Sequence, residues 1–77
     1  MHKLLDTVAL THALPELGLR AGNVGAVVDV LAADAYEVEF VAASGRTQAL
    51  ATVGAADVRA LGDRDLLAVR SLAESAA

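Results

Sequence analysis

Three carboxylates, Asp29, Glu37 and Glu39, are the side chains of this sequence whose types and spacing come nearest to a functional site. Glu37 and Glu39 alternate with large apolar residues, which is the two-residue period of a half-buried strand. If this run pairs with the preceding apolar run as a hairpin, Asp29 lies directly opposite one of the two glutamates on the outer face. Like charges so placed are destabilising. The face is therefore predicted to bind a basic protein partner; a simple solvated surface and a calcium or magnesium site are the alternatives.

The other residues with chemical potential lack the partners that catalysis or metal binding needs. His2 and His12 have no third ligand at a recognisable metal-binding spacing. Ser44 and Ser71 have no base or motif beside them. The glycines of residues 18–25 superficially resemble a phosphate loop, but a strand follows them instead of a helix, and the run has no lysine. No catalytic, cofactor-binding or metal-binding residue is predicted, and the chain is not expected to be an enzyme.

Length and composition predict one small domain, residues 1–77, with a thin core. Hydrophobic residues make up 56% of the chain, but 18 of them are alanines. A protein partner or a second copy of the chain is therefore expected to add stability. There is no cysteine for a disulfide or a thiolate metal site. The net charge of −4 disfavours nucleic acid as a partner. With no apolar run long enough for a membrane span or a signal peptide, a cytoplasmic protein is expected.

The hairpin that carries the carboxylates is predicted from two alternating runs, residues 24–31 and 36–41. Opposed residues of an antiparallel pair share a face, so their numbers must sum to an even number if both core sets point inward. A sum of 66 pairs Val30 with Tyr36, and a shift of two residues is the competing register. The same sum pairs Val28 with Val38 and Ala26 with Phe40. The predicted core residues are Val24, Val28, Val30, Tyr36, Val38 and Phe40.

The other segments complete a small all-β barrel of four to five antiparallel strands over about residues 4–61. Residues 4–14 fit either a strand or a helix. The strand at residues 46–53 has two possible inward faces, one with Ala49, Ala51 and Val53 and the other with Leu50. A short closing strand is predicted at residues 58–61.

The long loop before the hairpin is predicted at residues 14–23 and contains two leucines, Leu17 and Leu19. They are either plugs for the core or an exposed apolar patch that adds to the partner surface. Tight turns are predicted at the glycines Gly18, Gly22, Gly25 and Gly45.

A C-terminal α-helix is predicted at about residues 63–75. Asp63 can cap its first turn, and the helical period places Leu66, Val69, Leu72 and Ala73 on one face. This apolar stripe must bury against the barrel or against a partner.

Four motifs in order resemble the bacterial family catalogued as domain of unknown function 4926. They are Asp-Thr-Val after a leucine-rich start at residues 4–8, Leu-Pro at residues 14–15, a glycine turn at residues 22–25, and Tyr-Glu-Val-Glu-Phe at residues 36–40. A late Asp-Val-Arg extends the resemblance to about residue 61. Asn23 departs from the pattern, because an acidic residue is common at that place in the family.

The resemblance implies an SH3-like barrel and brings no catalytic residues. Members of such families often lie beside toxin genes, which implies an antitoxin or immunity role. We therefore expect a non-enzymatic protein-interaction module that binds the basic surface of a neighbouring gene product. The alternative is an accessory or assembly module of a larger enzyme, or a self-associating domain that docks through its C-terminal helix.

Overall fold

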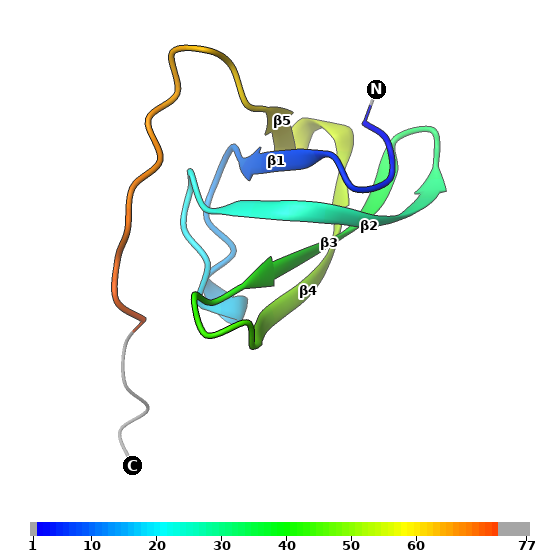
Figure 1. The fold of residues 1–77 in the computed structure, drawn as a ribbon. Coiled ribbons are helices and arrows are strands. Elements are labelled where there is room, and N and C mark those ends of the chain that lie inside the picture. The colour runs from blue at the N-terminus through cyan, green and yellow to red at the C-terminus, as the bar shows by residue number, and fades with distance from the viewer. Residues whose placement is uncertain (1, 73–77) are drawn as a thin grey trace.

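Five antiparallel strands in a single sheet make up the fold of the computed structural model, which describes residues 2–72 (Figure 1). The strand order is β4-β3-β2-β1-β5. β3 and β4 are strongly inclined to β1, so the sheet is curved (Figure 1). The all-β prediction is confirmed. The strands are β1 (Thr7–Leu10), β2 (Val24–Ala32), β3 (Ala35–Val41), β4 (Thr47–Gly54) and β5 (Val58–Ala60), and two short 3₁₀ helices are η1 (Pro15–Leu17) and η2 (Ala55–Asp57).

The core lies on the inner side of this curved sheet and takes residues from every strand. β1 contributes to it as a strand, which decides between the two readings of residues 4–14. In β4 the small residues point inward, while Leu50 is 53% exposed. The buried cluster is Val8, Leu10, Leu19, Val27, Tyr36, Val38, Phe40, Ala49, Ala51, Val53 and Val58.

The predicted inward face of β2 is wrong before Asp29. Val27 is fully buried there, whereas Val24 is 37% exposed and Val28 is half-buried. Val30 lies on the predicted side, opposite Tyr36, but is 44% exposed. The reason is a register shift between Val27 and Asp29, which leaves Val28 without a partner and reverses the alternation there.

The register of the β2–β3 hairpin follows from the same irregularity. Val30 pairs with Tyr36, as the sum of 66 predicts. On the side of the shift nearer the start of β2, the numbers of paired residues sum to 65. Val38 therefore pairs with Val27 and not with Val28. For the same reason Ala26 lies opposite Glu39 and not opposite Phe40.

Gly25 is not a turn residue. Gly18, Gly22 and Gly45 have positive φ, but Gly25 lies inside β2, buried and opposite Val8 of β1. Its missing side chain leaves room for the neighbouring strand β3, because an added β-carbon would lie 2.7 Å from Cγ1 of Val38.

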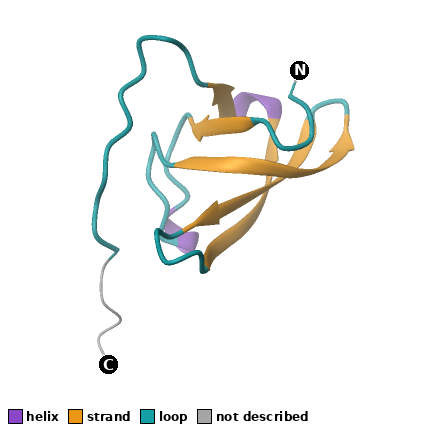
Figure 2. Ribbon diagram, in the orientation of Figure 1, coloured by secondary structure: helices purple, strands orange, loops and turns teal. Residues whose placement is uncertain are grey.

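The predicted C-terminal helix is also wrong as far as the structure describes the chain. Residues 63–72 form no helix and run as an extended segment beside the sheet (Figure 2); residues 73–75 of the prediction lie outside the described residues. Asp65 instead accepts two hydrogen bonds of 2.8 Å from the guanidinium of Arg59 and one from Gly62 N–H. Arg70 donates to the carbonyl oxygen of Gly18. An isolated helix of this length is only marginally stable without packing against other elements, so these contacts determine the extended conformation of residues 63–72.

Candidate functional site

The three predicted carboxylates lie together on the outer side of the β2–β3 hairpin. We call Asp29, Glu37 and Glu39 the acidic face. Asp29 lies directly opposite Glu37 across the two strands, and Glu39 follows two residues along β3 on the same side. Asp29 is exposed, while the two glutamates are half-buried. The β2–β3 pairing thus brings together carboxylates that are eight to ten residues apart in sequence.

Threonines of β4 hold the two glutamates in place. Thr52 Oγ1 donates a hydrogen bond of 2.6 Å to Glu37 Oε1, and Thr47 Oγ1 donates to Glu39 Oε2. Each glutamate keeps a second carboxylate oxygen that can accept a hydrogen bond from a partner. Val41, 50% exposed, continues the same side of β3 beyond Glu39.

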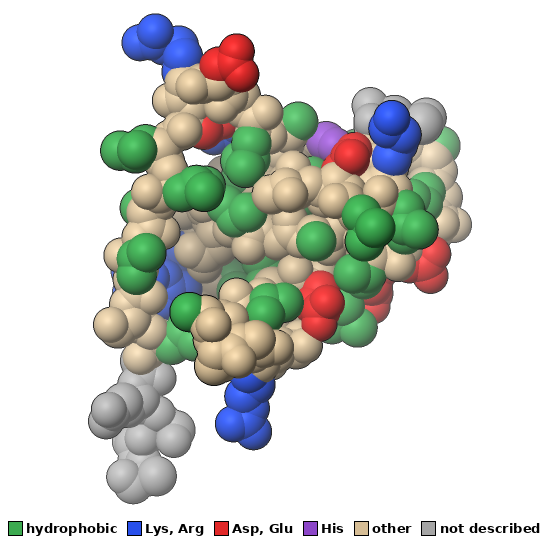
Figure 3. Space-filling view, viewed as in Figure 1, with side chains coloured by type: hydrophobic (Ala, Val, Ile, Leu, Met, Phe, Trp, Pro, Cys, Tyr) green, Lys and Arg blue, Asp and Glu red, His purple; other side chains and the backbone are tan. Residues whose placement is uncertain are grey.

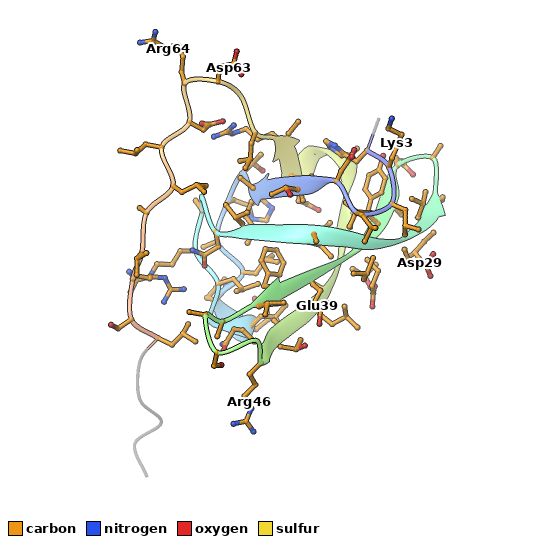
Figure 4. The ribbon with its side chains drawn as sticks, viewed as in Figure 1. Lys3, Asp29, Glu39, Arg46, Asp63 and Arg64 are labelled. Atoms are coloured by element: carbon orange, nitrogen blue, oxygen red, sulfur yellow. The ribbon has the colours of Figure 1, made fainter. Side chains whose placement is uncertain are left out.

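Cations do not neutralise the acidic face. Within residues 2–72, no lysine or arginine forms an ion pair with any of its three carboxylates. Figure 4 shows Asp29 and Glu39 on neighbouring strands, with Lys3, Arg46 and Arg64 in other parts of the molecule. The face therefore presents net negative charge that only a partner or the solvent can balance.

Two leucines of the predicted partner surface do not belong to it. Leu19 is 4% exposed and is part of the core, and Leu17 packs against that core partly buried. The structure thus favours a core role for both leucines over an exposed apolar patch. The leucines and valines that do reach the surface include several in residues 61–72, which we call the C-terminal segment. These are Leu66 (93% exposed), Leu67, Val69 and Leu72. Figure 3 shows hydrophobic side chains along the left of the molecule.

The sequence analysis missed a pair formed by His12 and Asp57. The Nε2 atom of His12 lies 2.7 Å from Oδ1 of Asp57, and its Nδ1 atom lies 3.0 Å from the carbonyl oxygen of Ala13. Gly54 N–H donates to the other carboxylate oxygen of Asp57. The hydrogen bonds that His12 donates to Asp57 and to the carbonyl oxygen of Ala13 raise the pKa of His12, and the bond that Asp57 accepts from His12 lowers the pKa of Asp57.

This pair forms a clasp between segments that are distant in sequence. Both ring nitrogens of His12 face oxygen acceptors, and the protonated, doubly donating imidazolium satisfies both. The clasp joins the end of β1 to η2. No local sequence pattern connects the two residues, which come together because β5 pairs with β1, with Leu10 opposite Val58.

A pH series on His12→Gln tests the clasp. A raised pKa means that His12 contributes stability below its ordinary value of about 6.5 and loses it as the pH rises through the higher folded value. The lowered pKa of Asp57 means that its contribution is lost on acidification below about 4. We expect the melting temperature of the wild type to exceed that of His12→Gln most near pH 5.5, with the gap narrowing by about pH 9. A gap that grows toward pH 9 would contradict the assignment.

The remaining polar residues considered as candidates have local roles. The ring of His2 lies edge-on to Tyr36, with the ring centroids 5.3 Å apart. Ser44 Oγ accepts the N–H of Arg46 in the β3–β4 turn, and Ser71 lies in the C-terminal segment. In the part of the chain that the structure describes, no three His, Cys, Asp or Glu residues are grouped to hold a metal ion, and no helix could cross a membrane.

Comparison with known proteins gives one match. The model of a family described as "Domain of unknown function (DUF4926)" matches residues 4–60, which include all five strands and the acidic face. The C-terminal segment lies outside the match. No curated protein and no solved structure matches the chain.

Proposed function

The chain belongs to the DUF4926 family, and from this premise we propose that it is a non-enzymatic protein-interaction module whose acidic face binds a basic partner. The observation that carries the proposal is the pairing of Asp29 with Glu37 across β2 and β3. Two carboxylates placed directly opposite each other cost stability. A partner that supplies Lys or Arg side chains would remove this repulsion and gain from the preoriented glutamates.

An SH3-like barrel is the finer description of the fold that we propose. The order β4-β3-β2-β1-β5, with a 3₁₀ helix between β4 and β5, supports it. So does the placement of residues from all five strands in a single core. In such a fold the outer side of the β2–β4 strands is a rigid surface, which suits recognition of a preformed basic groove.

The most specific form of the proposal is an antitoxin or immunity-like protein that covers the basic active-site groove of a toxin. Charge complementarity speeds the association of such pairs and fixes their orientation. The occupation of both His12 nitrogens supports a binding role over catalysis.

The test compares three tagged forms of the protein as bait in lysate of the native host. In the face variant, Asp29→Asn, Glu37→Gln and Glu39→Gln remove three negative charges from the acidic face. The control variant removes three exposed negative charges elsewhere, by Glu16→Gln, Asp34→Asn and Asp63→Asn. Wild type and control should recover the same basic protein in stoichiometric amount. The face variant should bind that protein at least about tenfold more weakly, and the wild-type affinity should fall as salt rises.

Equal binding by the face and control variants would overturn the proposal. Equal weakening of both would also overturn it, because total charge and not this face would then carry the binding. Circular dichroism of each bait separates a lost contact from a lost fold.

A second candidate function is an accessory or assembly module of a larger enzyme. The apolar side chains exposed along the C-terminal segment favour it, since Leu66 and Val69 are 93% and 100% exposed. Recovery of an enzyme subunit that is retained by the face variant but lost on Leu66→Ser with Val69→Ser would support this candidate over the first.

A further inference from the structure

One edge of the sheet is long, uncharged and open. β4 pairs only with β3, and Figure 1 shows no strand beyond it. Apart from that ladder, residues 47–53 make no backbone hydrogen bond to the rest of the described chain. β4 contains no charged residue and no proline. A β-carbon on Gly18 would lie 3.4 Å from Nε2 of Gln48, so a loop flanks the start of the strand. The open stretch is therefore residues 49–53.

The other edge of the sheet is protected in the ways that natural proteins use. β5 has only three residues, and its central residue is the charged Arg59. Arg59 also holds Asp65 of the C-terminal segment, which passes beside this edge. Short length, charge and a covering segment all discourage pairing with another chain. β4 has none of these features.

We propose that β4 is a self-association edge, where a second copy of this chain adds its own β4 antiparallel and extends the sheet to ten strands. Pairing about Ala51 uses the whole open stretch. It places outward residues against outward residues, Leu50 opposite Thr52 of the partner, and inward against inward, Ala49 opposite the partner's Val53. Each flanking pair joins a larger residue to a smaller one, the central pair is two alanines, and the exposed Leu50 gains apolar contact.

Charge does not oppose this pairing. The nearest carboxylates of the acidic face lie on β3 in both copies, which are three strand spacings apart, about 14 Å. This exceeds the screening length of about 8 Å at physiological ionic strength. Because the strand is uncharged, a second copy fits it better than a charged peptide does.

The test measures the mass of the purified chain by light scattering and sedimentation, at concentrations up to about 1 mM. The wild type should approach twice the monomer mass of 7.8 kDa. Leu50→Lys should remain a monomer over the same range, because it puts a positive charge on the edge of each copy. Lys at this position faces Glu39 within the chain, so the variant should stay folded. The matched control is Leu31→Lys on the β2–β3 hairpin, where Leu31 is 50% exposed against 53% for Leu50; it should dimerise as the wild type does.

Hydrogen exchange followed by mass spectrometry locates the contact. Amides of residues 49–53 should exchange more slowly in the concentrated wild type than in the dilute protein, and Leu50→Lys should lose this difference. A wild type that stays a monomer throughout the range would overturn the proposal. A dimer that survives Leu50→Lys, or one whose protected amides lie in the C-terminal segment, would overturn it equally. None of these measurements uses a basic partner, so the result is independent of the acidic face.

Discussion

Gly25→Ala is expected to destabilise the protein by about 1 to 3 kcal/mol, toward the upper end of that range. Gly25 is buried in β2, and an added β-carbon would lie 2.7 Å from Cγ1 of Val38 and 2.8 Å from the carbonyl oxygen of Glu39. It would also lie 2.9 Å from Cδ2 of Phe40. Side chains can turn away from such a contact, but the carbonyl oxygen is part of the backbone of β3, which pairs with β2. The two strands must therefore separate, and their separation would also displace Glu39 of the acidic face.

Urea denaturation of Gly25→Ala and Gly62→Ala measures this effect. Gly62 is exposed, and an added β-carbon there would come no nearer than 3.7 Å to another atom, Oδ2 of Asp65. Alanine in such a place is neutral or stabilising by about 0.4–1 kcal/mol, because it restricts the unfolded chain. The two glycine variants should thus move the unfolding midpoint in opposite directions or by very different amounts. A Gly25→Ala protein as stable as Gly62→Ala would show that the β2–β3 contact is not as tight as described.

The error at Gly25 shows what a sequence pattern leaves undecided. Three glycines within eight residues predict turns. Gly18 and Gly22 do adopt the positive φ that a turn requires, whereas Gly25 is needed because a side chain would clash with β3. Both demands select glycine, and only the position of the neighbouring strand separates them. Before the register shift the inward face of β2 therefore contains Gly25 and Val27, which is the opposite of what the valines at even positions predict.

The acidic face is the part of the site that sequence reasoning could place. Strict alternation in β3 predicts that Tyr36, Val38 and Phe40 point inward and that both glutamates point outward; the three large residues are buried in the structure. The error in register does not affect the prediction of this face. The shift at Val28 changes the sum of paired residue numbers by one only before Asp29, so Asp29 still lies opposite Glu37. The bulge itself has no local signal, since valine is as suitable for a regular strand as for an irregular one.

The C-terminal segment and the clasp could not be predicted, because both depend on contacts between distant residues. The period of Leu66, Val69 and Leu72 is helical, but Arg59 and Gly18 hold the segment extended through Asp65 and Arg70. His12 reaches Asp57 only because β5 pairs with β1. A helical period indicates that a segment can form a helix. Hydrogen bonds to distant residues can nevertheless stabilise an extended conformation instead.

Tyr36→Ala has the largest effect that we expect in this chain. Tyr36 is fully buried and is the largest fully buried side chain. Its hydroxyl accepts the N–H of His2 at 3.3 Å and donates to the carbonyl oxygen of Ala33 at 3.2 Å. Loss of an aromatic side chain from a core costs about 3–5 kcal/mol. A domain of this size has a total stability of about 4–12 kcal/mol. The variant should therefore lose between about a quarter and all of its stability, and its urea midpoint should fall accordingly.

Tyr36→Phe and Val30→Ala separate the parts of this effect. Tyr36→Phe keeps the ring and removes the hydroxyl, so about 1 kcal/mol should be lost. Val30 lies directly opposite Tyr36 on β2 but is 44% exposed, so Val30→Ala should cost well under the roughly 3 kcal/mol of a buried truncation. Urea unfolding, followed by circular dichroism and by the single tyrosine's fluorescence where it remains, ranks the three variants. If Val30→Ala proved as damaging as Tyr36→Ala, this end of β2 would have to be as closely packed as the buried ring, which contradicts the exposure of Val30.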